Sequence, residues 1–347
     1  MVKSKNPSFT FADLFAGIGG MRMAFERAGG VCVLTSEIDS HARATYGNQR
    51  WASDDSRHIH VNDVVDLGNM AKAKTPDFDV MVAGFPCQPY SIAGLRQGFD
   101  DEKGRGQVFL SMLDILRKKR PKAFLLENVR GMLSHDAGRT IAYMVERLRG
   151  CGYDLLTPTV LNSMTHGGVP QNRERVFIIG FRRDLKVPVA LSEVESLFDN
   201  ATPVSEFKWP KVTKPKKELQ DLLDLEGVNE KYFYTPEKYD CYAEIAEAMT
   251  RIDTAYQWRR VYVRENKSGV CPALTANMGT GGHNVPLVKV NDEIRKLTPR
   301  ECARLQGFPE TFRFPSGMAD AHLYHQFGNS VTVPLIEKIA KELVRHL

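Results

Sequence analysis

Short apolar runs and segments with helical periodicity alternate along the first half of the chain. The apolar runs predict β-strands at Phe9–Leu14, Val31–Ser36, Phe78–Ala83, Ala123–Glu127 and Arg175–Phe181. Amphipathic segments between them predict helices at Met21–Ala28, Gln107–Arg117 and Thr140–Leu148. Strands that alternate with helices in this way predict an α/β fold with a doubly wound, mostly parallel sheet and helices on both of its faces.

The pattern changes after about Arg183. Residues 184–292 contain many prolines and aromatic-rich stretches with weak helical periodicity, which predicts a second, smaller β-containing domain. Helical periodicity then returns: Thr298–Glu301 has the sequence of a capping box, and Val333–Val344 that of an amphipathic helix. We therefore expect a larger domain at 1–183, the smaller domain at 184–292 and a C-terminal segment at 293–347.

Composition narrows the class of protein. With 42% hydrophobic and 26% charged residues, the 347-residue chain has the composition of a globular protein. No apolar run reaches the roughly 18 residues of a membrane helix, and the N-terminus is basic and polar, so we expect no membrane span, no signal peptide and a cytoplasmic location. The cysteines form no CxxC pair, which argues against structural zinc and a disulfide framework. We expect no metal, and any functional cysteine should act as a thiol.

The charge permits nucleic-acid binding without requiring it. The formal net charge is +5, which is mild for a chain of this length. Basic residues do gather locally, five lysines between Lys208 and Lys217 and then several arginines from Arg251 to Arg264. A solvated charged surface explains these clusters as well as a nucleic-acid contact does.

The first candidate site is the glycine-rich segment Asp13–Gly20, which lies between a predicted strand and a predicted helix. Glycines in such a turn let a ligand approach the backbone, as nicotinamide, flavin, nucleotide and S-adenosylmethionine sites all require. Glu37 follows the second strand and could accept hydrogen bonds from ribose hydroxyls. Asp63 could accept one from an adenine amino group. For either carboxylate alone, a surface charge in a loop is the simpler interpretation.

Three further segments carry reactive side chains where predicted strands end or begin. Cys87 lies between Pro86 and Pro89 after a buried strand, on a stiff loop where ligands of α/β proteins bind. Glu127 ends the next buried strand, at the same edge, and could hold or donate a proton. Arg173 and Arg175 point to one side as the chain enters a strand and could hold an anion or a carbonyl-rich base. A buried structural cysteine, a salt bridge or a strand-edge charge would explain each in isolation.

Taken together, the motifs resemble the ordered set of the DNA (cytosine-5)-methyltransferase family. The matching segments are DLFAGIGG, SEID, GFPCQPYS, ENVRG, QNRER, RKLTPRECARLQGFP and HQFGNSV. The resemblance covers nearly the whole chain, and the variable region falls where that family has its target-recognition domain. One departure is Asn62, which stands where a glycine commonly precedes the aspartate of the third motif.

The resemblance implies an S-adenosylmethionine-dependent methyltransferase fold. It implies a catalytic and cofactor-binding domain at 1–183, a target-recognition domain at 184–292, and a C-terminal segment that returns to the catalytic domain. The enzyme would transfer a methyl group to carbon 5 of a flipped-out cytosine in a specific short sequence of double-stranded DNA. The implied S-adenosylmethionine-binding residues are Phe15, Gly17, Glu37, Ile38, Asp63, Pro86 and Asn329, together with Gly19.

The same resemblance implies roles in catalysis. Cys87 would be the nucleophile, and Glu127 would stabilise the protonated ring and contact its exocyclic amine, to which the Pro86 carbonyl could also bind. Arg175 would hold the base carbonyl. Arg173 would order the site or contact a phosphate.

Contacts with DNA are expected from two glycine-rich segments. The segment 90–106 has the composition of a loop that closes over the substrate. In it Arg96 is a candidate to enter the duplex and Arg105 to meet a phosphate. In the predicted target-recognition domain, Asn277 and Thr280 are the candidates for base reading.

Other functions fit the sequence less well. The tRNA-modifying branch that resembles this family carries a Cys-Phe-Thr signature after its catalytic half, which this chain lacks. A catalytically inactive DNA-binding relative would not need Cys87, Glu127 and Arg175. A nicotinamide oxidoreductase would explain only the glycine loop. We expect a monomer, for which a restriction endonuclease acting on the same site can be a functional partner without forming a stable complex.

Overall fold

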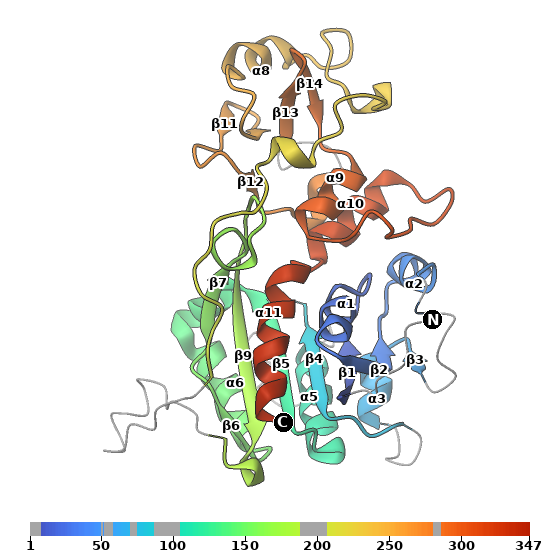
Figure 1. Ribbon diagram of the computed structural model, residues 1–347, viewed down its shortest axis with the longest axis vertical. Coiled ribbons are helices and arrows are strands. Elements are labelled where there is room, and N and C mark those ends of the chain that lie inside the picture. Colours follow the sequence, from blue (N-terminus) through green and yellow to red (C-terminus); the bar gives the residue numbers. More distant parts are fainter. Residues whose placement is uncertain are drawn as a thin grey trace.

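The structure is a computed structural model of the chain, and it describes residues 8–49, 51, 58–69, 75–86, 105–187, 207–279 and 286–347. A large eight-stranded sheet lies at one end of the molecule and a smaller four-stranded sheet at the other (Figure 1). The order across the large sheet is β3-β2-β1-β4-β5-β9-β6, and β7 also pairs with β9. Its strands are β1 (Phe9–Leu14), β2 (Gly30–Ser36), β3 (Ile59–Val61), β4 (Val80–Gly84), β5 (Ala123–Val129), β6 (Tyr153–Leu155), β7 (Thr159–Asn162) and β9 (Glu174–Arg182).

The large sheet is mixed. The strands β1 to β5 run parallel to one another, as the alternation with helices predicted. Strand β9 runs antiparallel to β5, β6 and β7, and it places Phe177 opposite Glu127. Because the carboxyl ends of parallel strands meet at one edge, the loops after β1, β2, β4 and β5 converge there.

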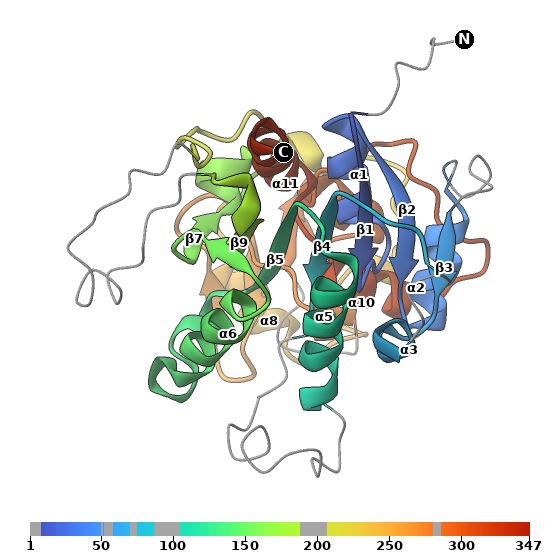
Figure 2. The ribbon, with the colours of Figure 1, turned by 90° about the horizontal axis from the view of Figure 1, so that it is seen from below.

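Helices cover both faces of this sheet, which confirms the doubly wound arrangement. In Figure 2, α1 (Gly20–Arg27) and α11 (Val333–Leu343) lie on one face, and α3 (Val64–Asn69), α5 (Arg105–Lys119) and α6 (Arg139–Arg149) lie on the other. The β5 side chains alternate between two buried clusters: Ala123 and Leu125 join the one that contains α11, and Phe124 and Leu126 the one that contains α5 and α6. Burial on both faces explains the continuous apolar runs.

The smaller sheet is antiparallel. Its strand order is β11-β10-β13-β14, formed by β10 (Tyr256–Trp258), β11 (Val263–Glu265), β13 (Leu287–Val290) and β14 (Glu293–Lys296). A short parallel pair, β8 (Gln171–Asn172) with β12 (Cys271–Pro272), connects this region to the large sheet. A domain boundary at residue 292 would divide the β13–β14 hairpin, so the region that contains the smaller sheet extends to Lys296.

The remaining helices are α2 (Ser40–Gly47), α8 (Tyr242–Ala248), α9 (Pro299–Leu305) and α10 (Asp320–Asn329). The predicted capping box is present at the start of α9: the Thr298 hydroxyl accepts from the Glu301 N–H, and the Glu301 carboxylate accepts from the Thr298 N–H. Glu301 also pairs with the buried Arg295 at 2.7 Å, which ties α9 to the smaller sheet. The C-terminal segment thus begins against the smaller sheet and ends with α11 against α1 (Figure 1).

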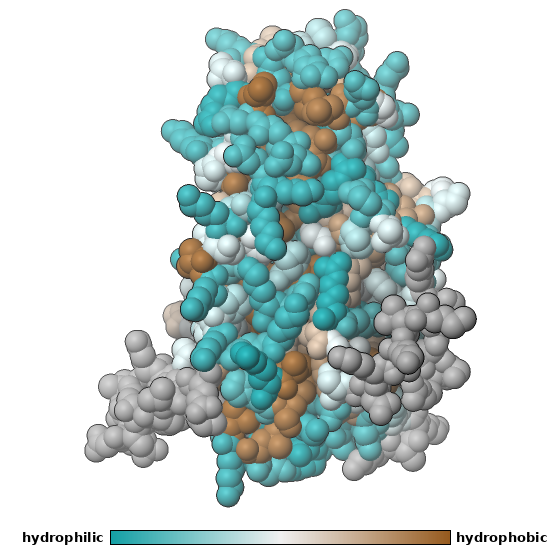
Figure 3. Space-filling view, in the orientation of Figure 1, coloured by the Kyte–Doolittle hydropathy of each residue, from teal (hydrophilic) through white to brown (hydrophobic). Residues whose placement is uncertain are grey.

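Hydrophilic residues cover most of the face seen in Figure 3, and hydrophobic residues gather on it in separate patches. Within the described ranges, no helix combines the length and apolar character that crossing a membrane requires.

Candidate active site

A cavity of about 530 Å³ lies at the carboxyl edge of the large sheet, where the loops after β1, β2 and β4 meet the end of β5, the start of β9 and the end of α10. Its volume lies within the range of small-molecule sites. The predicted site residues that line it are Phe15, Gly17, Glu37, Ile38, Pro86, Glu127, Arg173, Arg175 and Asn329. Segments that are distant in sequence therefore contribute to one site: three loops, the end of β5, the start of β9 and the end of α10.

The glycine loop gives this cavity a wall of backbone. Phe15 has a φ of 57° and Gly17 a φ of 55°, both in the left-handed region that most side chains avoid. Among the described residues, no atom lies within 4 Å of the position that a Cβ on Gly17 would take. The backbone at Gly17 is therefore open to a ligand, and a non-glycine residue at Phe15 is held in an uncommon conformation.

Gly19 has a different reason to be glycine. It precedes α1 with a φ of 89°, and a Cβ there would lie 2.7 Å from the Trp51 side chain. Gly19 does not line the cavity in the part of the chain that is described. Close packing against Trp51 explains this glycine without a ligand contact.

Glu37 and Ile38 form a polar and an apolar surface side by side. The Glu37 carboxylate accepts from the Gly17 N–H at 2.7 Å and from the Asp39 N–H at 2.8 Å, which fixes its position and leaves lone pairs on both oxygens. Ile38 is 69% exposed, which is unusual for a large apolar side chain. A fixed acceptor beside an exposed aliphatic surface matches the needs of a ribose attached to a flat purine.

Asp63 lies at the same edge but outside the cavity lining. It follows β3, and its carboxylate accepts from the Val65 N–H at 2.9 Å, at the start of α3. The capping of this helix accounts for the side chain in the structure.

Glu127 and Arg175 form an ion pair inside the cavity. Arg175 Nε lies 3.0 Å from Glu127 Oε1, and the two side chains are only 16% and 10% exposed. The antiparallel register of β5 and β9 explains the contact, since Arg175 lies opposite Val129, two residues beyond Glu127. Arg175 Nη1 also donates to the Glu174 carbonyl, so the guanidinium holds the carboxylate in a defined orientation.

Asn128 is a site residue that sequence reasoning missed. It is buried, and its Nδ2 donates to the Phe85 carbonyl at 2.9 Å. This bond ties the end of β5 to the loop that continues to Pro86, and so fixes two walls of the cavity relative to each other. Its place in the segment ENVRG was the available signal.

Arg173 is a buried clamp. The residue is 1% exposed, and its guanidinium donates to the carbonyls of Leu274, Gly328 and Ser330 at 2.6–3.0 Å. Burial, reinforced by the nearby Arg175, lowers the pKa of this guanidinium well below its usual range. These bonds hold three backbone segments together, so an ordering role fits this geometry better than a contact with a DNA phosphate.

Asn329 brings the C-terminal segment to the cavity. It is the last residue of α10, and its Nδ2 lies 3.3 Å from His325 Nε2. The Gly20 backbone packs closely against Ser330 and Val331, where a Cβ would come within 2.9 Å of both side chains. The return of the chain beside the glycine loop therefore depends on a glycine at the start of α1.

Several predicted residues cannot be placed. Cys87, Arg96 and Thr280 lie outside the described residues, and so does the side chain of Arg105, the first residue of α5. Asn277 is described: it is exposed in the short 3₁₀ helix Ala276–Gly279, and its Oδ1 accepts from the Thr275 hydroxyl at 2.9 Å.

The other cysteines are poor candidates for a nucleophile. Burial raises the pKa of every one of these thiols, and none of them lines the cavity: Cys32, Cys151, Cys241, Cys271 and Cys302. A thiol must ionise to attack, so a raised pKa makes each of them less reactive.

Asp13 is a buried carboxyl directly beneath the glycine loop. It is fully buried, its Oδ2 accepts from the Arg22 N–H at 3.1 Å, and its Oδ1 has no hydrogen-bond partner within the described part of the chain. Loss of solvation raises the pKa of Asp13 to about 8. The folded protein therefore holds a proton here at neutral pH, whereas the unfolded chain releases it.

This proton makes a testable contribution to stability. Between its ordinary pKa of 3.8 and about 8, the folded state binds one proton more, so the Asp13 contribution is complete below pH 3.8, falls as pH rises, and is constant above pH 8. We expect Asp13→Asn to remove a slope of up to about 1.4 kcal/mol per pH unit in the free energy of unfolding. Urea unfolding of both proteins from pH 5 to 8 measures it. Identical slopes would show that Asp13 titrates normally.

Comparisons with known proteins point to one family. Residues 9–345 match the family model described as C-5 cytosine-specific DNA methylase. The chain is 42% identical over 341 residues to the Type II methyltransferase M.Bsp6I of Bacillus sp. (strain RFL6), covering 97% of this chain and 98% of that one. It is 35% identical over 358 residues to the Type II methyltransferase M.HpaII of Haemophilus parainfluenzae, covering 98% and 90%.

Solved structures agree in fold. The Dnmt2 methyltransferase of S. pombe superposes with a TM-score of 0.69 at 21% identity, covering 97% of this chain and 98% of that one. A putative DNA modification methyltransferase encoded within an E. coli prophage gives a TM-score of 0.63 at 24% identity, covering 97% and 98%. At these identities the likeness concerns the fold alone.

Proposed function

The chain belongs to the C-5 cytosine-specific DNA methylase family, and from this premise we propose that it attacks a flipped-out cytosine through Cys87, within a specific short sequence of double-stranded DNA. As members of the family do, it methylates carbon 5 of cytosine in DNA with S-adenosylmethionine. The observation that carries the proposal is the Glu127–Arg175 pair, a fixed acid and cation in the cavity that also contains the glycine loop.

S-adenosylmethionine fits the part of the cavity formed by the glycine loop. The Glu37 carboxylate would accept from the ribose hydroxyls, and the exposed Ile38 side chain would pack on the adenine. Phe15, Gly17 and Asn329 would form the remaining wall. When bound, the cofactor supplies an electrophilic methyl group. Asp63, whose Oδ1 accepts from the Val65 N–H, would accept from the adenine amino group through its other oxygen.

The chemistry requires a thiolate, because carbon 5 of cytosine is a poor nucleophile. Addition of the Cys87 sulfur to carbon 6 turns the ring into an enamine, and carbon 5 can then take the methyl group. Glu127 donates a proton to ring nitrogen 3 as the sulfur adds, and Arg175 binds the base carbonyl. A base, for which ordered water suffices, then removes the carbon 5 proton. The carbon–sulfur bond breaks to release the Cys87 thiolate, and ring nitrogen 3 returns its proton to Glu127.

The cytosine must leave the helix for this reaction. Carbon 6 is inaccessible in a stacked duplex, and flipping costs a few kcal/mol. The cavity of about 530 Å³ would receive the base next to the cofactor. Arg96 and Arg105 remain our candidates for contacts with the opened duplex, in the segment after Cys87.

We assign sequence recognition to residues 184–296, which extends the predicted region 184–292 to the end of the β13–β14 hairpin. The catalytic domain is assigned to residues 1–183. We expect exchange of residues 184–296 for the equivalent region of a relative to change which sequence is methylated, while the product remains 5-methylcytosine. Bisulfite sequencing of DNA from a methylation-free host that expresses each protein measures both. If the methylated sequence is unchanged after the exchange, residues outside 184–296 recognise the DNA sequence.

The function itself is tested by a filter assay with methyl-labelled S-adenosylmethionine. We expect label in unmethylated double-stranded DNA and none in tRNA. Label in tRNA instead would favour an RNA-modifying enzyme, and label in neither would favour a DNA-binding relative without activity. The relatives' designation as Type II methyltransferases supports a restriction endonuclease as a functional partner of this enzyme.

A further inference from the structure

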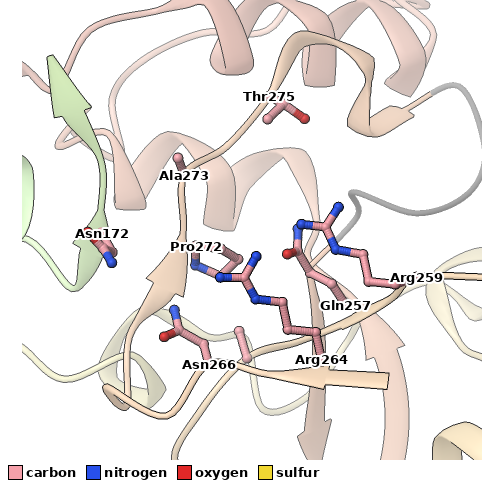
Figure 4. Close-up of a pocket in the computed structure, with 9 residues that line it drawn as sticks. Asn172, Gln257, Arg259, Arg264, Asn266, Pro272, Ala273 and Thr275 are labelled. Atoms are coloured by element: carbon pink, nitrogen blue, oxygen red, sulfur yellow. The ribbon is translucent and has the colours of Figure 1, made fainter. Parts of the chain in front are cut away.

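A second, polar hollow of about 300 Å³ lies between the smaller sheet and the β8–β12 pair (Figure 4). Two guanidiniums and three amides line it, from Arg259, Arg264, Asn172, Gln257 and Asn266, and no carboxylate is among the described lining residues. Such a surface is positive and rich in hydrogen-bond donors.

The register of the smaller sheet explains this charge. Gln257 on β10 lies directly opposite Arg264 on β11, so the two side chains share one face, which continues to Arg259. Glu265 alternates to the other face, where it pairs with Arg251 at 3.1 Å. Figure 4 shows the Arg259 and Arg264 guanidiniums on the same side of the strands as Gln257. Glu265, the acidic residue of this hairpin, therefore points away from the hollow.

The hollow is an immediate neighbour of the active-site cavity. Asn172 lines the hollow and the next residue, Arg173, lines the cavity. Thr275 lines the hollow and the next residue, Ala276, lines the cavity. Consecutive Cα atoms are about 3.8 Å apart, and base pairs are stacked about 3.4 Å apart. A duplex whose flipped-out cytosine occupies the cavity would therefore have its neighbouring base pairs within reach of the hollow.

We propose that Arg259 and Arg264 recognise guanine in the major groove, in base pairs next to the target cytosine. A guanidinium donates two parallel hydrogen bonds to the O6 and N7 of guanine, and a two-stranded ribbon such as β10–β11 fits the major groove. Gln257, buried beside Arg264, supports the arrangement from the same face. A phosphate would need only donors, whereas the amide lining also offers acceptors, which suits a base edge.

The inference rests on the proposed function, because it requires the cytosine to occupy the cavity. It is tested with Arg264→Ala and Arg259→Ala on duplexes with randomised positions around a cytosine, read by bisulfite sequencing. Each variant is expected to lose about 10- to 100-fold of discrimination at one position, where the wild type prefers guanine. Lys267→Ala is the matched control: it removes one exposed positive charge of the same hairpin region, outside the hollow, and should keep the preference.

Arg264→Lys separates base reading from phosphate contact. Lysine keeps the charge but not the planar fork, so it should retain affinity for DNA and still lose the guanine preference. If the alanine variants instead weaken methylation of all sequences equally and reduce its salt dependence, the arginines contact phosphates and the proposal is wrong. It is also wrong if a methylating wild type and both alanine variants share one preference. A wild type that methylates no DNA would contradict the proposed function itself.

Discussion

Replacement of Cys87 by serine is expected to reduce methyl transfer by more than about 100-fold while S-adenosylmethionine binding remains intact. A serine hydroxyl has almost no anionic form at neutral pH, so it cannot add to carbon 6 of cytosine at a useful rate. The remaining cysteines cannot substitute for it, because burial raises the pKa of each of them and none lines the cavity.

Initial rates with labelled cofactor, together with cofactor binding measured by calorimetry, test this prediction. Cys241→Ser is the matched control, since Cys241 is only partly buried and lies outside the active site. It should methylate DNA like the wild type. A Cys87→Ser enzyme that retained more than about one hundredth of the wild-type rate would exclude Cys87 as the nucleophile.

Glu127→Gln is expected to slow single-turnover methyl transfer by about 10²–10⁴-fold, with little change in DNA affinity. Glutamine has nearly the same shape, and its carbonyl oxygen can still accept from Arg175 Nε, which lies 3.0 Å from the carboxylate in the structure. What the amide lacks is an acidic proton that it can transfer to ring nitrogen 3. The substitution therefore removes proton transfer to the base and retains the contact with Arg175.

Glu174→Gln provides the control for this variant. Glu174 is close in space and pairs with Arg130 at 2.8 Å, but its side chain is 39% exposed and does not line the cavity. We expect a nearly normal rate. Equal single-turnover rates for Glu127→Gln and the wild type would reduce Glu127 to a structural partner of Arg175.

Much of the fold could be predicted because the strands of the large sheet are buried on both faces. Continuous apolar runs identified β1, β2, β4, β5 and β9 to within about two residues at each end. The loops that follow parallel strands must meet at one edge, which is why the sequence predicts that Glu127 lies at the same edge as the segment that begins at Pro86.

Pairing direction and side-chain partners could not be predicted in the same way. Periodicity does not show that β9 runs antiparallel to β5, yet this register brings Arg175 to Glu127. Arg173 and Arg175 look equivalent in the sequence, but one is a buried clamp on backbone carbonyls and the other faces a carboxylate. The short strand β3 and the helix α10 show no strong periodic pattern in the sequence. They are stabilised by packing against neighbouring elements, which periodicity does not reveal.

The most direct test of the account is whether Cys87 becomes covalently attached to the target base. A duplex with 5-fluorocytosine at the methylated position, identified first by bisulfite sequencing, has no carbon 5 proton to remove, so the adduct should persist after methyl transfer. With S-adenosylmethionine present, mass spectrometry should show the enzyme linked to DNA, and peptide mapping should locate the link at Cys87. An adduct at another residue, or none from an enzyme that methylates the ordinary duplex, would contradict the mechanism.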